Sequence, residues 1–143
     1  MTHTIETTIE VGASLATLRA AIGTPEGFRG WLAADTEVDA AGRYTFSFGP
    51  RAVTFAPNPA ADRDVRMTCV HERENPDWLG TELAITLTPL DADRTRVELT
   101  HAGYREKNDT FHRSVTGWTY FLSSLAAYAT TGKGAPFGAK VAA

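Results

Sequence analysis

The sequence predicts an α+β fold in which a curved antiparallel sheet of six or seven strands packs against one long helix near the C-terminus. Between residues 3 and 101, most segments alternate polar and apolar side chains, which is the pattern of half-buried strands. Over residues 111–131, apolar side chains instead recur every three or four positions, the spacing of one helix face. Such a helix spans about 30 Å. Its apolar face must be buried against another element, and the predicted strands supply a sheet that can cover it.

The first elements are one strand and two short helices. Residues 3–11 alternate well and predict the strand. Ser14 is placed to cap a helix over 15–22. The run Thr24–Glu26 then supplies a cap, a proline for the first helical position and an acidic first turn for a second helix that ends near Trp31.

The remaining strands and the long helix follow with short connections. Strands are expected over 36–39, 44–48, 53–55, 64–73, 81–90 and 95–101. Asn108, Asp109 and Thr110 are candidate N-caps of the long helix, and Gly132 is placed to end it. We expect one domain over residues 1–143, of which about 133–143 form a loose tail.

Composition excludes several classes of function. The net charge of -3 argues against a nucleic-acid partner, which a basic surface would favour. A single cysteine, Cys69, allows no internal disulfide or thiolate zinc cluster, and its apolar strand predicts an inert buried thiol. No histidine pair has metal-ligand spacing and no phosphate-binding glycine loop is present, so neither metal nor cofactor is expected. Without a signal pattern or an apolar run long enough for membrane insertion, we expect a cytoplasmic protein.

Several short stretches together resemble a known superfamily. They are Ile9–Val11 with Ser14–Leu18, Thr24–Glu26 leading to Trp31, Thr86–Leu90, Arg94–Val97, Leu99–Tyr104, and Gly117, Trp118, Leu122, Leu125 and Tyr128 before Gly132. The chain thereby resembles the START-like (SRPBCC) superfamily and its helix-grip fold, in which a curved sheet wraps around a long C-terminal helix. Within it, the chain is most similar to small bacterial proteins of the branch named for the activator of the heat-shock-protein ATPase. The resemblance implies a fold shared by ligand carriers, polyketide cyclases, hydrolases and co-chaperone modules.

The sequence also departs from this family. Leu32 stands where many relatives carry a second tryptophan beside the one that matches Trp31. Residues 48–63 contain three prolines and little strand character. We therefore expect the mouth of any pocket to differ from that of the relatives.

The sheet and helix faces supply candidate residues for a hydrophobic ligand pocket, although the same residues could equally fill a solid core. The candidate ligand-binding residues are Trp31, Phe46, Phe48, Phe55, Met67, Cys69, His71, Leu83, Ile85, Val97, His101, Trp118, Phe121, Leu122 and Leu125.

Two histidines are candidates for orienting a ligand or for catalysis. His71 is in register with apolar residues of its strand, as is His101, so each is expected to project inward near a strand end. A structural hydrogen bond is the alternative role for both. Tyr120 is a further candidate for a polar contact, although it lies off the apolar stripe of its helix.

Trp78 follows Asn75-Pro76-Asp77 in a predicted loop, where its ring could flank an entrance or simply pack against a hairpin.

The function that these sequence features favour is binding of a small hydrophobic or aromatic molecule between sheet and helix. A cyclase- or dehydratase-like enzyme that uses a pocket histidine is one alternative, and a co-chaperone-like interaction module is another. The chain is expected to be a monomer or a homodimer.

Overall fold

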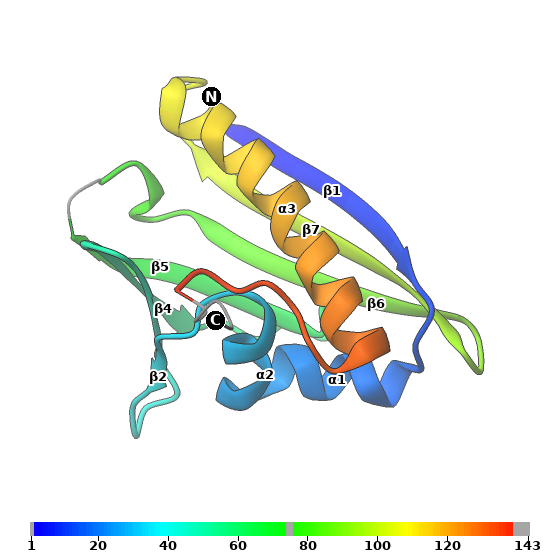
Figure 1. Cartoon of the computed structure of the whole chain (residues 1–143). Helices are drawn as coiled ribbons and strands as arrows, with labels where there is room; N and C mark the ends of the chain where they lie inside the picture. The colour runs from blue at the N-terminus through cyan, green and yellow to red at the C-terminus, as the bar shows by residue number, and fades with distance from the viewer. Residues whose placement is uncertain (1, 74–75, 139–143) are drawn as a thin grey trace.

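The computed structural model describes residues 2–73 and 76–138 and confirms the predicted α+β architecture (Figure 1). Its elements are β1 (His3–Val11), α1 (Leu15–Gly23), α2 (Pro25–Trp31), β2 (Thr36–Val38), β3 (Tyr44–Phe48), β4 (Arg51–Pro57), β5 (Val65–Arg73), the 3-10 turn η1 (Pro76–Trp78), β6 (Glu82–Asp91), β7 (Arg94–Tyr104) and α3 (Asp109–Thr131).

All seven strands form one antiparallel sheet in the order β1-β7-β6-β5-β4-β3-β2. Every neighbouring pair except β1 and β7 is consecutive in the chain, so most connections are simple hairpins. The pairing of β1 with β7 brings the first strand beside the last one. The helices α1 and α2 connect β1, at one edge of the sheet, to β2 at the other.

The helix ends use the caps that the sequence predicts. Ser14 accepts a hydrogen bond from the backbone N–H of Thr17, and Thr24 accepts one from that of Gly27. At α3, Asn108 accepts a hydrogen bond from the N–H of Phe111. Gly132 ends the helix with φ 82°, a left-handed conformation that glycine adopts without strain.

The long helix α3 crosses the sheet and packs chiefly on its β1 side (Figure 1). Beside α3, the helix α2 covers part of the β3–β4 side. Its Phe28 ring contacts the rings of Phe46 and Trp31 at centroid distances of 5.2 and 5.6 Å. The Trp31 indole N–H donates to the carbonyl of Ala21, which locks α2 against α1.

Part of the segment expected to form a tail is held in place. The backbone N–H of Phe137 donates to the carbonyl of Leu32, and its carbonyl accepts from Ala34. The Ser124 hydroxyl accepts the N–H of Ala135 at 2.7 Å. Residues 133–138 therefore run back beside α2, while 139–143 lie outside the described residues.

Within the described ranges, the structure contains no helix with the length and apolar character required to cross a membrane.

Candidate functional site

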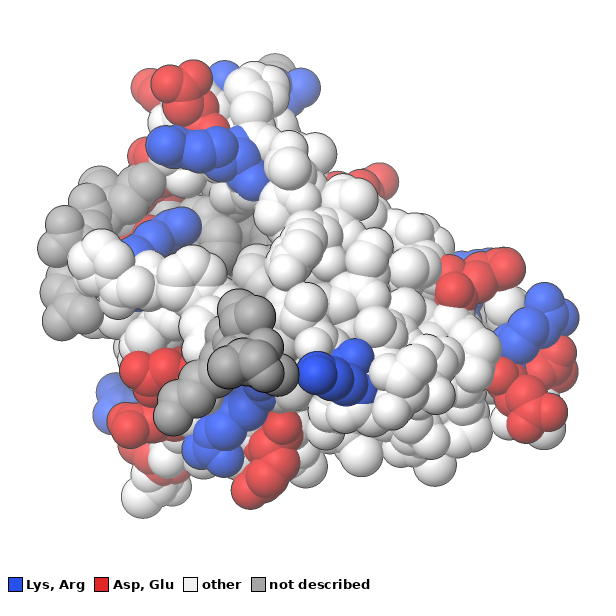
Figure 2. Space-filling view, viewed as in Figure 1, with Lys and Arg blue, Asp and Glu red and all other residues white. Residues whose placement is uncertain are grey.

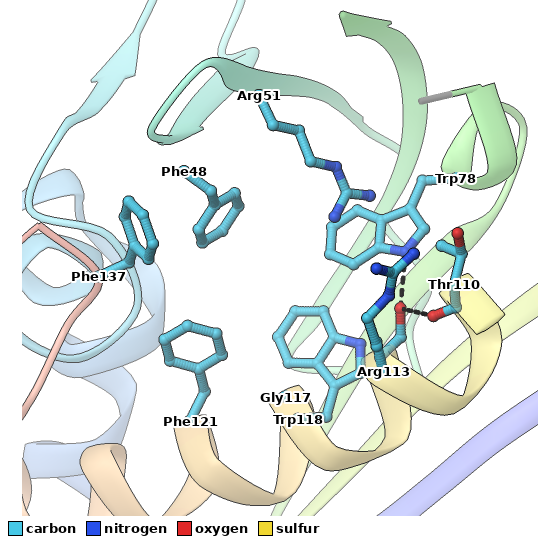
Figure 3. A pocket seen from close by; sticks show the side chains of 10 residues that line it. Phe48, Arg51, Trp78, Thr110, Arg113, Gly117, Trp118, Phe121 and Phe137 are labelled. Carbon is cyan, nitrogen blue, oxygen red and sulfur yellow. Dashed lines mark hydrogen bonds between the residues drawn. The ribbon is translucent and has the colours of Figure 1, made fainter. Parts of the chain in front are cut away.

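A cavity of about 600 Å³ lies between the first half of α3, the β3–β4 hairpin and η1 (Figure 3). Its volume falls within the range of small-molecule sites. The described residues that line it are Phe48, Arg51, Trp78, Thr110, Arg113, Ser114, Gly117, Trp118, Phe121 and Phe137.

Five of the ten described lining residues are aromatic. Trp78 and Trp118 stack at a centroid distance of 5.8 Å and an interplanar angle of 13°. Opposite them, Phe48 contacts Phe121 at 6.1 Å and Phe137 at 5.7 Å. These side chains come from β3, η1, α3 and the C-terminal segment, so the cavity depends on the folded arrangement of all four.

A bulge in β5 corrects one expectation from the sequence. Thr54 pairs with His71 and Phe55 with Cys69, which leaves Val70 as an extra residue. The bulge reverses the alternation of side chains, so His71 is exposed instead of projecting inward as expected. The following residue, Glu72, turns inward, and its side chain is fully buried.

The buried Glu72 carboxylate fixes one side of the cavity. Its Oε1 accepts a hydrogen bond from Nε of Arg51 at 2.6 Å, and its Oε2 accepts the backbone N–H of Trp78 at 2.9 Å. The Arg51 guanidinium lies 4.3 Å from the centre of the Trp78 ring, a cation–π contact. One buried acid thus positions both a charged and an aromatic lining residue.

A second bulge, in β7, lies beneath the cavity. His3 pairs with Tyr104 and Thr4 with Ala102, so Gly103 is the extra residue. Its φ of 96° belongs to the left-handed region, which favours glycine. The bulge lets both His101 and Tyr104 point inward although they are three positions apart.

His101 is fully buried below the cavity and is hydrogen-bonded through both ring nitrogens. The indole N–H of Trp118 donates to Nδ1 at 3.0 Å, and the Tyr104 hydroxyl lies 2.9 Å from the same nitrogen. Because Nδ1 accepts, the neutral ring carries its proton on Nε2, which donates to Thr81 Oγ1 at 2.7 Å. The Thr81 hydroxyl in turn donates to the carbonyl of Trp78.

Burial is the main cause of the perturbed acid–base behaviour near the cavity. It lowers the pKa of His101 to about 3, and the positive charge of Arg51 adds to the effect. Burial likewise raises the pKa of Tyr104 above its usual value. For Cys69, burial and the nearby Glu72 charge raise the pKa to about 11, which keeps the thiol protonated.

A second polar chain joins η1 to α3. The indole N–H of Trp78 donates to the hydroxyl of Ser114 at 3.0 Å, and this hydroxyl donates to the carbonyl of Thr110 at 2.7 Å (Figure 3). Each of the two stacked indoles therefore donates its only N–H to an acceptor within the protein. A ligand at this wall would therefore meet apolar ring atoms and not an indole N–H donor.

Gly117 leaves space in the middle of α3. A Cβ atom added at this position would meet nothing within 4 Å, and the residue lines the cavity. Glycine inside a helix costs about 1 kcal/mol relative to alanine. Helix stability alone would therefore favour another residue at position 117, whereas a cavity that must stay open favours glycine.

The structure brings few of the predicted ligand-binding residues to the cavity. Phe48, Trp118 and Phe121 line it. The others, apart from the exposed His71, are buried core residues that lie away from its lining: Trp31, Phe46, Phe55, Met67, Cys69, Leu83, Ile85, Val97, His101, Leu122 and Leu125. Tyr120 also lies outside, where its hydroxyl donates to the carbonyl of Ala135.

Several lining residues were not predicted from the sequence. The residues without a predicted role are Arg51, Thr110, Arg113, Ser114, Gly117 and Phe137, and the sequence suggests Trp78 only for an entrance or for packing against a hairpin. Arg113 and Gly117 precede Phe121 by eight and four positions, and Ser114 precedes Trp118 by four, so the helical period could have indicated them. Nothing in the sequence pattern indicates the return of Phe137.

The described residues contain no group of three or more histidine, cysteine, aspartate or glutamate side chains that could hold a metal ion. The chemistry of the cavity wall is that of apolar rings, two hydroxyls and two guanidinium groups.

Comparisons with solved structures define the class of fold. A seven-stranded antiparallel sheet with a long C-terminal helix is a helix-grip arrangement, and the similar structures share this fold. The solution structure of the Aha1 dimer from Colwellia psychrerythraea has a TM-score of 0.78 and 25% sequence identity, and the match covers 92% of this chain and 99% of that one.

Two more distant matches show the same fold. CalU16 from Micromonospora echinospora has a TM-score of 0.70 at 17% identity, with 90% of this chain and 75% of that chain covered. DynU16, from the dynemicin biosynthetic locus, has a TM-score of 0.66 at 18% identity, with 92% and 48% covered. No protein-family model and no curated protein matches the sequence.

Proposed function

We propose that this protein binds a small apolar or aromatic molecule in the cavity between α3, the β3–β4 hairpin and η1. The observation that carries the proposal is the open volume at Gly117, in a wall that contains five aromatic side chains. A ligand in contact with the aromatic part of the wall would gain about 25 cal/mol for each Å² of apolar surface removed from water.

Binding has more support than catalysis by a histidine. The buried ring of His101 does not line the cavity, and both of its nitrogens already have partners inside the protein. Its lowered pKa makes it a weak base, since the neutral ring is favoured even in mild acid. His71 is exposed on the other side of β5. Neither histidine is therefore placed to exchange a proton with a molecule in the cavity.

The test uses N-phenyl-1-naphthylamine, a neutral aromatic dye whose fluorescence rises in apolar surroundings. The wild-type protein is expected to bind it with saturable enhancement. The variant Gly117→Leu fills the cavity with a good helix former and should weaken binding by about tenfold or more. The matched control Thr116→Leu adds the same side chain on the exposed side of α3 and should bind like wild type.

Binding that is the same in Gly117→Leu and wild type, with both variants folded, would overturn the proposal. So would a wild-type protein that does not bind the dye.

The outer face of α3 favours a second candidate function, self-association. From residue 114 to residue 132 the helix carries no charged side chain, and Val115 is 39% exposed. Figure 2 shows this surface as a broad uncharged area, with charged side chains gathered toward the ends and lower edge of the view. One similar protein, the Colwellia Aha1, was solved as a dimer.

Sedimentation equilibrium tests this second candidate. If a second copy covers the outer face of α3, wild type will show a dimer and Val115→Glu will shift it toward monomer, because a charge would be buried in the contact. Val38→Glu changes a valine of similar exposure on β2, 40%, and should leave the dimer intact. A monomer at every concentration would exclude self-association.

A further inference from the structure

The charged residues that line the cavity are both positive. Of the described residues that line it, only Arg51 and Arg113 carry a charge. Arg51 extends from β4 and Arg113 from α3, so the two side chains approach the cavity from opposite sides (Figure 3). An apolar wall with two guanidinium groups is typical of a site for a molecule that has both an apolar body and an anionic group.

Arg51 has donor capacity that its protein partner does not use. Glu72 Oε1 takes the hydrogen bond of Arg51 Nε, and Oε2 is occupied by the backbone N–H of Trp78. The Arg51 Nη2 atom lies in ion-pair contact with the same Oε1, but it is buried without a hydrogen bond of acceptable geometry. Because Nη2 itself is buried, a ligand would be held by the accessible remainder of the guanidinium, since the Arg51 side chain is 26% exposed and lines the cavity.

The second guanidinium has a different setting. Arg113 is exposed on the first half of α3, and no described carboxylate makes an ion pair with it. Its charge is therefore not cancelled locally in the way that the buried Glu72 offsets Arg51. The two groups together leave an excess of positive charge beside the aromatic wall.

We propose that the ligand is an apolar or aromatic acid whose anionic group is held by Arg51 and attracted by the charge of Arg113. This inference rests on the proposed function, because it assigns the chemical class of the molecule that fills the same cavity. The apolar body would lie against the aromatic part of the cavity wall. A planar oxyanion such as a carboxylate matches the forked donors of a guanidinium.

Two dyes that share one aromatic body test the charge separately from the cavity. N-phenyl-1-naphthylamine is neutral, and 8-anilinonaphthalene-1-sulfonate is the same ring system with a sulfonate anion. Titrations of both dyes would be made with wild type, Arg113→Gln, Arg51→Lys and the cavity variant Gly117→Leu. Arg63→Gln serves as the control, since it removes one positive charge from an exposed turn outside the cavity.

The expected result is selective loss of the anionic dye. Arg113→Gln should weaken binding of the sulfonate dye about tenfold and change binding of the neutral dye less than about twofold. Arg51→Lys keeps the positive charge beside Glu72 but removes the fork, so it should also affect only the anionic dye. Raising the salt concentration should weaken binding of the sulfonate dye but not binding of the neutral dye. Arg63→Gln should change the binding of neither dye.

Other outcomes separate the two proposals. If both dyes bind and Gly117→Leu blocks both, but neither arginine variant discriminates between them, the cavity is a ligand site and the assignment of an anionic ligand is wrong. If the arginine variants weaken binding of both dyes equally, the assignment of an anionic ligand is also wrong, because the loss of affinity would then reflect the shape of the cavity. If neither dye binds wild type, the proposed function fails and the anionic ligand fails with it.

Discussion

The indole N–H of Trp118 donates a hydrogen bond to Nδ1 of His101 at 3.0 Å. This contact ties a cavity-lining ring on α3 to a buried ring on β7, so the position of the aromatic wall depends on a histidine that does not itself reach the cavity. It also requires a neutral imidazole, since a charged ring would present a donor to another donor. The stability of the site should therefore depend on pH.

Acid should destabilise the fold through His101. Its pKa is near 3 in the folded protein and near 6.5 when unfolded, so between these values the unfolded chain binds more protons. The histidine's contribution is complete above about pH 6.5 and is lost at up to about 1.4 kcal/mol for each pH unit as the pH falls. Chemical unfolding of wild type and His101→Gln from pH 7 to 4 measures this difference. Parallel stability curves would contradict the account.

Filling the space at Gly117 should stabilise the protein. Gly117→Ala adds a methyl group where nothing lies within 4 Å and removes the helix penalty of glycine, so the free energy of unfolding should rise by about 1 kcal/mol. Urea unfolding measures the change. A loss of stability would show that the position is crowded and that the cavity is not open there.

Removing the charge of Glu72 should destabilise the β4–β5 side of the cavity. Glu72→Gln leaves the Arg51 guanidinium without its carboxylate, at a site where the arginine side chain is 26% exposed. Because that exposure provides some solvation, we expect a loss of about 2 kcal/mol, less than for a fully buried pair. The companion variant Glu82→Gln breaks a more exposed pair with Arg66 and should cost less than about 1 kcal/mol. Equal losses in the two variants would contradict this.

The C-terminal segment should loosen when its anchor is removed. The Ser124 hydroxyl donates to the carbonyl of Trp31 and accepts the N–H of Ala135, so Ser124→Ala breaks both connections. We expect a loss of about 1–2 kcal/mol and faster hydrogen exchange at Phe137, whose ring lines the cavity. Ser123→Ala, on the exposed side of α3, is the matched control. Unchanged exchange at Phe137 in Ser124→Ala would argue against this anchoring role.

The sequence predicted the fold well because long periodic segments and caps are local signals. The alternation over 3–11 and the helical stripe from Phe111 gave the correct elements, and Ser14, Thr24 and Gly132 act at the helix ends as expected. These features depend on near neighbours in the chain, which a sequence shows directly.

The candidate site was predicted less well because it depends on bulges and on contacts between distant segments. The extra residue at Val70 exposes His71 and buries Glu72, and strict alternation gives the opposite result for both. Gly103 produces a second bulge inside β7, although the sequence suggested a strand end there. Phe137 reaches the cavity through the fold of a segment without periodicity.

The most direct test of the central claim, that the ligand binds in this cavity, uses the indole N–H signals of the three tryptophans in a ¹⁵N–¹H correlation spectrum. Trp78 and Trp118 line the cavity, whereas Trp31 is fully buried with its N–H bonded to Ala21. Titration with N-phenyl-1-naphthylamine should shift the signals of Trp78 and Trp118 and leave that of Trp31 in place. Saturable binding that shifts only Trp31, or shifts none of the three, would contradict the account.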